Sequence, residues 1–507
     1  MNRKSLLLGI DLGTTNVKAI FIDETGNYIC SASRELTIDN PKPNWVEQDS
    51  NQWWQKTCEC IKEITEKPEV GSDKIACIAA SGQGCGALPL DSSGKAIYSA
   101  IIWMDFRAEK ECKQFGKHQD EIFKISGNTL DPVQNVASIL WLKNNRPETY
   151  KKTSKFLTAT AFLNYMLTDN FIENDSDAGL SVLYDMHKKN WSKELADLYD
   201  ISLNKMPEIR KCTDLVGSIN KELAEITGLM EGTPVCAGGE DTSSAALAMG
   251  IYKNGQVGLS TGTSTNLVLC IDKNIALKNS LNMPHVIDGF RFVSGNIPTS
   301  GICMDWFKNL FNNIENDNSI IKLNKNFLRY LDKEAEKAPP GSGNIIFLPY
   351  LAGSAYPISN PEARGVFFGL SLSTNRSHIS RAILEGVAFS YRSIIDYLCE
   401  NEFTVSEMYA TGGPTKSEIW NQISSDVCNI PIFLLDTIAE ATVGDAMIAG
   451  VACGIFKDFK EAIQKTVKIG KKYYPNIENK KIYSKLYKIE MDLFKTLFPI
   501  YVEVLKT

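Results

Sequence analysis

Short apolar runs along this chain alternate with glycine-rich turns and amphipathic segments, a pattern that predicts strands and helices in mixed order. Strands are expected at 6–10, 75–80, 345–348 and 407–410, and helices at 51–63, 377–399 and 418–428. Strands followed by alternating helices occur in each half of the chain. This arrangement predicts an α/β protein of two related lobes, each built on a mixed sheet.

The division between the lobes is expected near the middle of the 507 residues. Two lobes of about 250 residues each fit the usual size limits of a domain. Residues 236–239 are expected to form the last strand of the first lobe, and the small-residue segment 243–249 a helix leading into the second. The predicted lobes are therefore 1–246 and 247–507, with ligands bound in a cleft between them.

One short sequence occurs twice, each time between two apolar runs. The first copy reads Asp11-Leu-Gly-Thr-Thr and the second Ser260-Thr-Gly-Thr-Ser, so that Gly13 aligns with Gly262 and Thr14 with Thr263. Each copy predicts a hairpin whose turn directs backbone N–H groups and small hydroxyls at one point, as in phosphate-binding loops. Two such hairpins predict one polyphosphate held between two related lobes.

The two copies differ where Asp11 in the first is replaced by Ser260 in the second. A single carboxylate beside a phosphate turn is enough for Mg²⁺, which keeps most of its waters in proteins. Asp11 is therefore the predicted metal ligand, and the alternative is that it only caps the turn. Lys18 either screens phosphate charge or faces solvent.

Asp241 follows two glycines and stands at a predicted helix start. Phosphoryl transfer to an alcohol needs a base for the accepting hydroxyl, and we predict that Asp241 is this base. The alternative is that Asp241 is a helix N-cap, and the adjacent Glu240 is the rival candidate for the base.

Two further loops carry candidate residues. Gly412 and Gly413 would let a flat ring lie against the backbone of a nucleoside pocket, although Gly-Gly-Pro alone is also an ordinary turn. Gln83 is expected at a strand end. Asp105 could accept hydrogen bonds from sugar hydroxyls and Arg107 could donate to them, with a surface ion pair as the alternative.

Composition excludes several classes of protein. The net charge of −6, without a gathering of Lys and Arg, argues against a nucleic-acid partner. Thirteen scattered cysteines and four isolated histidines form neither a disulfide framework nor a zinc motif. No apolar run is long enough for a membrane span, and 5–10 is too short for a signal peptide, so we expect a cytoplasmic protein.

Taken together, these motifs resemble the FGGY carbohydrate kinases, which belong to the actin-like (ribonuclease H-like) superfamily. The resemblance covers nearly the whole chain. Its motifs are Gly9-Ile-Asp-Leu-Gly-Thr-Thr15, Trp45-Val-Glu-Gln-Asp49, Ser81-Gly-Gln83, Gly238-Gly-Glu-Asp241, Ser260-Thr-Gly-Thr-Ser264, Phe347-Leu-Pro-Tyr350, Arg364-Gly-Val-Phe-Phe-Gly369, Glu385-Gly-Val-Ala388 and Gly412-Gly-Pro414. Each motif alone is weak, and their occurrence in this order is specific.

The resemblance implies an ATP-dependent kinase in which Asp241 deprotonates a sugar hydroxyl, Asp11 lies near Mg²⁺, and 247–507 is the nucleotide-binding lobe. The residues implied around ATP are Thr14, Thr15, Asn16, Lys18, Gly262, Thr263, Gly301, Gly412, Gly413 and Ser417. Those implied around the sugar or polyol are Gln83, Gly84, Cys85, Asp105, Arg107 and Asp241.

The substrate is expected to be a ketopentose. The D-xylulose kinases carry Met-His where this chain has Gly84-Cys85, and the 83–86 loop with Asp105 and Arg107 is more similar to L-xylulose kinases. D-xylulose, ribulose, erythritol, glycerol and gluconate stay open, as do a sugar-responsive binding protein and an actin-like ATPase. The resemblance is compatible with a homodimer, which no residue pattern decides.

Overall fold

The computed structural model describes residues 5–310 and 318–504, which divide into two compact units built from discontinuous segments. Unit 1 is the chain up to Lys253 together with Asp272–Val293 and Thr437–Lys468. Unit 2 is Asn254–Ile271, Ser294–Asp436 and the chain from Ile469. The predicted boundary at 246/247 falls seven residues before the first segment of unit 1 ends at Lys253. The segment 437–468 therefore belongs to unit 1, although it comes late in the sequence.

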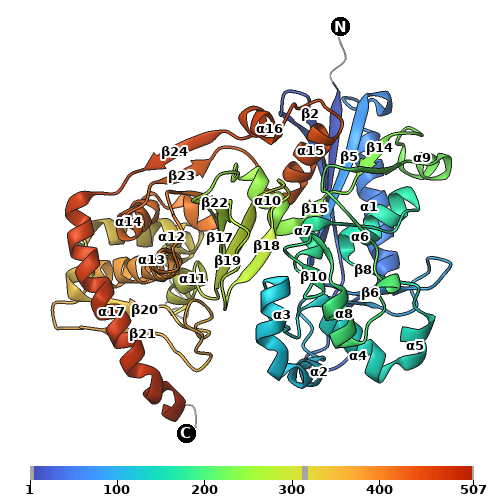
Figure 1. Cartoon of the computed structure of the whole chain (residues 1–507). Helices are drawn as coiled ribbons and strands as arrows, with labels where there is room; N and C mark the ends of the chain where they lie inside the picture. The colour runs from blue at the N-terminus through green and yellow to red at the C-terminus, as the bar shows by residue number, and fades with distance from the viewer. Residues whose placement is uncertain (1–4, 311–317, 505–507) are drawn as a thin grey trace. The chain divides into compact units, whose positions relative to one another are not determined.

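Unit 1 is built on a mixed sheet with the strand order β13-β14-β5-β1-β2-β3 (Figure 1). Its central strand, β1, pairs antiparallel with β2 and parallel with β5. The strands are β1 (Leu6–Leu12), β2 (Asn16–Asp23), β3 (Tyr28–Glu35), β5 (Ile75–Gly82), β13 (Leu215–Ser218) and β14 (Pro234–Cys236), and β15 (Gly239–Glu240) pairs with β5. The predicted strands 6–10 and 75–80 are confirmed as β1 and β5.

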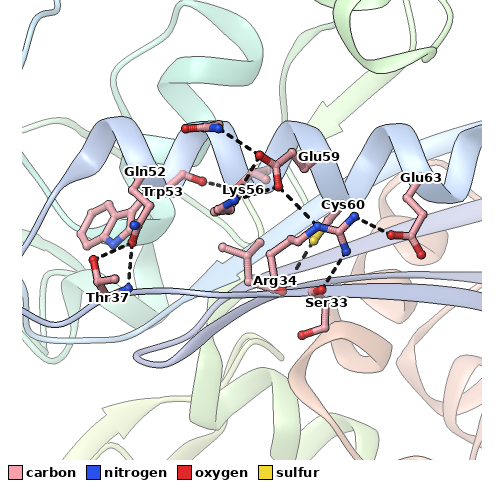
Figure 2. A network of polar contacts seen from close by, with 12 residues as sticks. Ser33, Arg34, Thr37, Gln52, Trp53, Lys56, Glu59, Cys60 and Glu63 are labelled. Carbon is pink, nitrogen blue, oxygen red and sulfur yellow. Dashed lines mark hydrogen bonds and ion pairs between the residues drawn. The ribbon is translucent and has the colours of Figure 1, made fainter.

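One face of this sheet is covered by helix α1 (Ser50–Thr65), whose side chains Trp53, Cys60 and Ile64 are buried. They join one hydrophobic cluster with every second residue of β1, from Leu6 to Leu12. Figure 2 shows the outer edge of this contact, where Arg34 on β3 reaches Glu63 at 2.6 Å and Glu59 at 3.3 Å. These ion pairs are partly exposed, so we assign the packing of α1 to its buried side chains.

The other face of the sheet is covered by α10 (Asp241–Ala248) and α15 (Ala441–Ala452). Leu7 on β1 joins Leu247 and Val443 in a second hydrophobic cluster. Gly9 lies on the same face as Leu7, and a Cβ atom at Gly9 would stand 1.9 Å from the carbonyl oxygen of Thr442. The close approach of α15 to β1 therefore requires glycine at position 9.

The rest of unit 1 consists of further helices and short strands, some of which enclose a third hydrophobic cluster. Its helices are α2 (Glu109–Gln114), α3 (Gln119–Ser126), α4 (Asn135–Asn145), α5 (Pro147–Lys152), α6 (Ala159–Thr168), α7 (Asp175–Ala178), α8 (Lys193–Tyr199), α9 (Lys221–Thr227) and α16 (Phe459–Thr466). Its short strands are β4 (Glu47–Gln48), β6 (Leu88–Leu90), β7 (Ala100–Ile101), β8 (Lys155–Leu157), β9 (Ile172–Asn174), β10 (Tyr184–Asp185), β11 (Asn190–Trp191), β12 (Glu208–Arg210) and β18 (Leu281–Pro284).

Unit 2 is also built on a mixed sheet, with the order β18-β19-β17-β16-β22-β23-β24, in which β18 and the first residues of β19 come from a segment of unit 1. The strands are β16 (Gln256–Thr261), β17 (Thr265–Ile271), β19 (Arg291–Ile297), β22 (Glu407–Gly412), β23 (Ile432–Leu435) and β24 (Ile469–Tyr473), with a separate pair β20 (Ile346–Leu348) and β21 (Val366–Phe368). The helices are α11 (Ile302–Asn309), α12 (Asn318–Lys337), α13 (Arg376–Glu400), α14 (Glu418–Cys428) and α17 (Ile477–Val504). The prediction of two α/β units with mixed sheets is confirmed.

The two predicted hairpins occupy equivalent places in the two sheets. In each sheet the first strand of the hairpin pairs antiparallel with the second and parallel with a later strand, β5 in unit 1 and β22 in unit 2. The turns differ in length, because Leu12 lies opposite Val17 whereas Thr261 lies opposite Thr265. The second turn is thus one residue shorter than the first.

Among the described residues, no helix combines the length and the apolar composition needed to cross a membrane.

We expect Gly9→Ala to destabilise unit 1, because its new methyl group would collide with the backbone of α15. Overpacking of this kind costs about 1–3 kcal/mol, and the melting temperature should fall by several degrees. Gly116→Ala is the matched control, since no atom lies within 4 Å of a Cβ placed at that exposed position. Equal melting temperatures of the two variants in a thermal scan would contradict the assigned contact.

Candidate active site

The carboxylate of Asp11 lies near the end of β1, beside Ser81 at the end of the neighbouring strand β5. The hydroxyl of Ser81 donates to Asp445 Oδ2 at 2.7 Å and lies 3.4 Å from Asp11 Oδ1. Asp445 comes from the buried helix α15. Two carboxylates from distant parts of the sequence therefore meet at one serine hydroxyl.

Burial governs the electrostatics of this pair. Loss of hydration, the largest cause, and the negative charge of Asp241 together raise the pKa of Asp11 to about 7. Burial also raises the pKa of Asp445 well above its ordinary value. Lys18 opposes the shift of Asp11, and its ammonium group is paired with Glu440 at 3.1 Å in a largely exposed position.

The residues around Asp11 fit a hydrated divalent cation. Asp11, Ser81 and Asp445 present oxygen atoms, which hard cations prefer. Within residues 5–310 and 318–504, no group of three acidic, histidine or cysteine side chains is arranged to enclose a metal ion. The donor set therefore fits an ion that retains most of its waters, as Mg²⁺ does.

Asp241 is the first residue of α10, and the capping role belongs to its neighbour. The side chain of Glu240 accepts a hydrogen bond from the backbone N–H of Ser243 at 2.8 Å and is buried. Asp241 is half-buried, and its Oδ1 accepts a hydrogen bond from the hydroxyl of Thr242 at 3.0 Å. The N-cap alternative for Asp241 is therefore wrong, and Glu240 is occupied as the cap.

Further buried carboxylates, Asp177 and Glu173, belong to the same part of unit 1 as Asp241. Burial raises the pKa of Asp177 to about 7, with a further contribution from the charge of Asp241. Asp177 belongs to the short helix α7, and the hydroxyl of Ser176 on that helix accepts a hydrogen bond from the backbone N–H of Glu240. Burial also raises the pKa of Glu173. Helix α7 thus holds the backbone that leads into Asp241.

Gln83 contacts the first hairpin. Its amide nitrogen donates to Gln48 Oε1 at 2.7 Å, and its Oε1 accepts from the hydroxyl of Thr14 at 3.2 Å. Gln48 in turn donates to the carbonyl oxygen of Thr14 at 2.8 Å, and the indole N–H of Trp103 donates to the hydroxyl of Thr14 at 2.9 Å. These hydrogen bonds fix the turn that contains Thr14.

Sequence reasoning gave no role to Gln48 or Trp103. Gln48 lies in the motif of residues 45–49, and this motif was the sequence feature that could have indicated its role. Of the other hairpin residues, Thr15 is exposed and accepts a hydrogen bond from the side-chain amide of Asn16.

Gly84 and Cys85 bring the same loop close to the carboxylates. A Cβ atom at Gly84 would lie 3.4 Å from Glu240 Oε1 and 2.8 Å from Leu180 Cδ1. Cys85 has a positive φ of 63°, and its thiol donates to Gln134 Oε1 at 3.6 Å. Burial raises the pKa of the Cys85 thiol, and the charge of Glu240 adds to the shift. The loop 83–85 therefore lies close to Glu240, the residue before Asp241.

Asp105 and Arg107 form a buried ion pair. The Arg107 guanidinium donates to Asp105 Oδ2 at 2.7 Å and to Glu47 Oε1 at 2.7 Å, and its side chain is fully buried. Its plane also lies 4.0 Å from the ring centroid of Trp45. The alternative of a surface ion pair is therefore wrong, and the contacts that the structure gives these two side chains are with protein groups.

Unit 2 contains a cavity of about 900 Å³, a size typical of ligand sites. Gly262, Thr263, Gly301, Gly413 and Ser417 all line it, together with Asp332. The hairpin is held at this cavity by α11, since the backbone N–H of Gly301 donates to the carbonyl of Gly262 at 2.9 Å.

The segment 413–416, part of which lines this cavity, follows directly after β22. Gly412 has a φ of 106°, which lets the chain turn sharply from β22 into this segment. Ser417 is the N-cap of α14, and its hydroxyl donates to Asp332 Oδ1 at 2.8 Å. A glycine-rich backbone beside apolar side chains such as Leu328 and Trp420 and cationic ones such as Lys333 suits a nucleotide.

Comparison with known proteins gives matches over both halves of the chain. The model of the FGGY family of carbohydrate kinases, N-terminal domain, matches residues 6–248, and that of the C-terminal domain matches residues 257–453. A xylulose kinase of Lactococcus lactis is 30% identical, with 96% of each chain covered. A gluconokinase of Bacillus subtilis is 26% identical over 99% of this chain and 98% of its own length.

Solved structures agree with these matches. The structure of a xylulose kinase from Rhodospirillum rubrum is 25% identical, with a TM-score of 0.90 over 98% of this chain and 99% of the other. A glycerol kinase from Plasmodium falciparum, with ADP, is 23% identical, has a TM-score of 0.85 and covers 97% of this chain and 98% of its own. The latter similarity supports the fold alone.

We expect Asp177→Asn to change the pH dependence of stability. The folded-state pKa of about 7 exceeds the ordinary 3.8, so the protonated carboxyl is favoured on folding and its stabilising contribution is lost as pH rises through 7. The asparagine cannot ionise. The melting temperature of the variant should therefore rise relative to that of the wild type between pH 5 and pH 8.

The control for this comparison is Asp39→Asn, which changes an exposed carboxylate of the same unit. Its difference from the wild type should stay constant over the same range. A constant difference for Asp177→Asn as well would show that this carboxyl does not titrate in the folded protein as assigned.

Proposed function

Because this chain belongs to the FGGY family of carbohydrate kinases, we propose that it phosphorylates a ketopentose, favouring L-xylulose, with Asp241 as general base. ATP is the phosphate donor of such a sugar kinase. The observation that carries the proposal is the position of the Asp241 carboxylate at the start of α10. Glu240 caps this helix, so the Asp241 side chain is not used as the cap. The loop 83–85 lies against Glu240.

The base role of Asp241 rests on its surroundings. Thr242 orients one carboxylate oxygen, and the carboxylate is half-buried, so a substrate hydroxyl can approach it. The buried neighbours Asp177 and Glu240 have raised pKa values, which favours their protonated forms, while Asp241 is the most exposed of the three. In this arrangement Asp241 accepts the proton of the sugar hydroxyl as that oxygen attacks phosphorus.

Asp11 is the proposed ligand for Mg²⁺, with Ser81 and Asp445 behind it. A divalent cation supplies positive charge that offsets the phosphate oxygens and would favour the ionised form of Asp11. Ser81 holds Asp445 in place by a 2.7 Å hydrogen bond and keeps it beside Asp11. Lys18 adds a cation at the edge of the same site, although Glu440 shares its charge.

The nucleotide is assigned to the cavity of unit 2. Gly262 and Thr263 would contact phosphate oxygens through backbone N–H groups, and Gly301 permits the close approach of α11 behind them. Gly413 and Ser417 line the part of the cavity away from the hairpin, where a base and ribose fit. In unit 1, Thr14, Thr15 and Asn16 form the equivalent turn.

Substrate choice is assigned to the 83–85 loop. A Cβ atom at position 84 would stand 2.8 Å from Leu180 Cδ1, so this loop has no room for the methionine of the D-xylulose kinases unless Leu180 shifts. Gln83 is proposed to position Thr14, because its amide oxygen accepts a hydrogen bond from Thr14 and its amide nitrogen donates one to Gln48. Asp105 and Arg107 are proposed at the sugar subsite, where their ion pair lies against the ring of Trp45.

A panel of sugars tests this function. The wild type, with ATP and Mg²⁺, should phosphorylate L-xylulose with a higher kcat/KM than D-xylulose, ribulose, erythritol, glycerol or gluconate, as measured by a coupled ADP assay. NMR of the product identifies the phosphorylated hydroxyl. A higher kcat/KM for D-xylulose or gluconate would contradict the substrate preference assigned from Gly84 and Cys85. Full turnover without a divalent cation would contradict the proposed role of Mg²⁺.

Asp241→Asn should keep nucleotide binding and lose most turnover. General base catalysis typically contributes about 10²–10⁴-fold, so kcat should fall by that amount while the Kd for ATP, measured by calorimetry, is unchanged. Glu231→Gln, an exposed carboxylate of the same unit, is the control and should retain full activity. Undiminished sugar phosphorylation by Asp241→Asn would end its assignment as the base.

A further inference from the structure

The nucleotide cavity of unit 2 is lined by one side of each of two helices and by the start of a third. Helix α11 contributes Met304 and Lys308, and α12 contributes Leu328, Asp332 and Glu336. Residues four apart lie on the same side of a helix, so each helix presents one side to the cavity. The first turn of α14 also lines it. Asp332 therefore lies within the wall that is assigned to the nucleotide.

Asp332 is the least exposed carboxylate of this wall. It is half-buried, whereas Asp305, Glu336 and Glu418 are exposed. Burial raises the pKa of Asp332, although the hydrogen bond from Ser417 opposes the shift. The carboxylate has thus lost part of its hydration, and a ligand that donates a hydrogen bond to it would replace the lost interaction.

One oxygen of this carboxylate is already in use. The hydroxyl of Ser417 donates to Asp332 Oδ1 at 2.8 Å, and the oxygen of the same hydroxyl accepts from the backbone N–H of Trp420 at 3.2 Å. Among the described residues, no lysine or arginine pairs with Asp332. Asp332 Oδ2 has no partner there either, and it is not one of the enclosed polar atoms, so it keeps accessible surface. This oxygen can therefore accept a hydrogen bond from a ligand in the cavity.

The chemistry of a nucleotide limits what can meet this oxygen. The phosphate groups carry negative charge near neutral pH and accept hydrogen bonds, so they would repel a carboxylate. The hydrogen-bond donors of ATP and ADP are the amino group of adenine and the two hydroxyls of ribose. An acidic acceptor in this cavity therefore fits the nucleoside and disfavours the polyphosphate.

The contacts of the cavity wall separate Asp332 from the phosphate turn. The carbonyl of Gly262 accepts from the backbone N–H of Gly301, and a Cβ atom at Gly301 would stand 3.2 Å from Pro414 Cγ, so these three residues meet at the hairpin. Asp332 is joined to a later residue, Ser417, at the start of α14. Ser417 belongs to the part of the cavity that is assigned to the base and ribose, and Asp332 lies beside it.

A tie between α12 and α14 is the simpler role for Asp332. Its hydrogen bond with Ser417 does join the two helices. Such a tie needs one oxygen, however, and gives no function to the accessible Oδ2. It also predicts an equal loss of affinity for every nucleotide when the carboxylate is removed. This expectation separates the two roles.

We propose that Asp332 is a specificity-determining residue of the nucleotide site, where Oδ2 accepts a hydrogen bond from the adenine amino group or from a ribose hydroxyl while Ser417 fixes Oδ1. This inference rests on the proposed assignment of the nucleotide to the cavity of unit 2. It does not depend on the identity of the sugar or on the role of Asp241.

Binding of ADP and three analogues to the full chain, with Mg²⁺, tests this role without turnover. Asp332→Ala should raise the Kd for ADP, measured by calorimetry, by about 10- to 100-fold, as expected when a hydrogen bond to a charged group is lost. IDP has a carbonyl in place of the adenine amino group, and the two monodeoxy forms of ADP each lack one ribose hydroxyl. For the analogue that lacks the partner of Asp332, the ratio of the Kd values of variant and wild type should fall toward one.

Asp492→Ala is the matched control, because Asp492 is an exposed carboxylate of α17 in the same unit and lies outside the cavity. It should bind ADP as the wild type does. If Asp332→Ala does not fold, Asp332→Asn keeps the size of the side chain and an oxygen for Ser417, and it should still weaken ADP binding by about tenfold.

Two results would overturn the inference alone. One is a folded Asp332 variant that binds ADP as tightly as the wild type. The other is an equal loss of affinity for ADP and all three analogues, which is the behaviour of a tie between α12 and α14. A wild type that binds none of these nucleotides would overturn the proposed nucleotide site itself, and the inference with it.

Discussion

The close contact between β1 and α15 is the constraint on which the candidate site of unit 1 depends. It brings a segment more than four hundred residues away in sequence against the central strand, and Gly9 leaves the space for the backbone of Thr442. Because side chains alternate along a strand, Asp11 lies on the same face as Gly9 and thus on the side of α15. The meeting of Asp11, Ser81 and Asp445 follows directly from this packing.

Crowded, buried carboxylates are the electrostatic result of the same packing. Asp11, Asp177, Glu240 and Asp445 all have raised pKa values, and burial is the largest cause in each case. Such a group is costly to keep in a folded protein unless protons or a cation offset its charge. A site of this kind is therefore suited to an ion that arrives with its own hydration shell and is needed only during turnover.

The sequence predicted much of the framework and less of the site. Hairpins, central strands and long helices were predictable because each depends on local patterns of apolar residues and glycine. The role of Glu240 as the cap was not, because two adjacent acids at a helix start look alike until backbone geometry selects one. For Arg107 the sequence left a surface ion pair open, whereas Trp45 and Glu47 bury the side chain, and those contacts link residues some sixty positions apart. Asp445 was not predictable as a neighbour of Asp11, since long-range packing leaves no mark on local sequence.

The unequal lengths of the two hairpin turns have a consequence for the alignment of the two halves and for exchanges between them. An alignment that superposes Gly13 on Gly262 places Lys18 against Leu267. In the sheets, however, the residue equivalent to Lys18 is Asn266, because Lys18 lies opposite Asp11 and Asn266 lies opposite Ser260. A one-residue slip turns every side chain of a strand to the other face. A chimaera that exchanges the two turns by aligned glycines would turn each side chain of the following strand to the opposite face of the sheet, so any transplant between the halves must add or delete one residue.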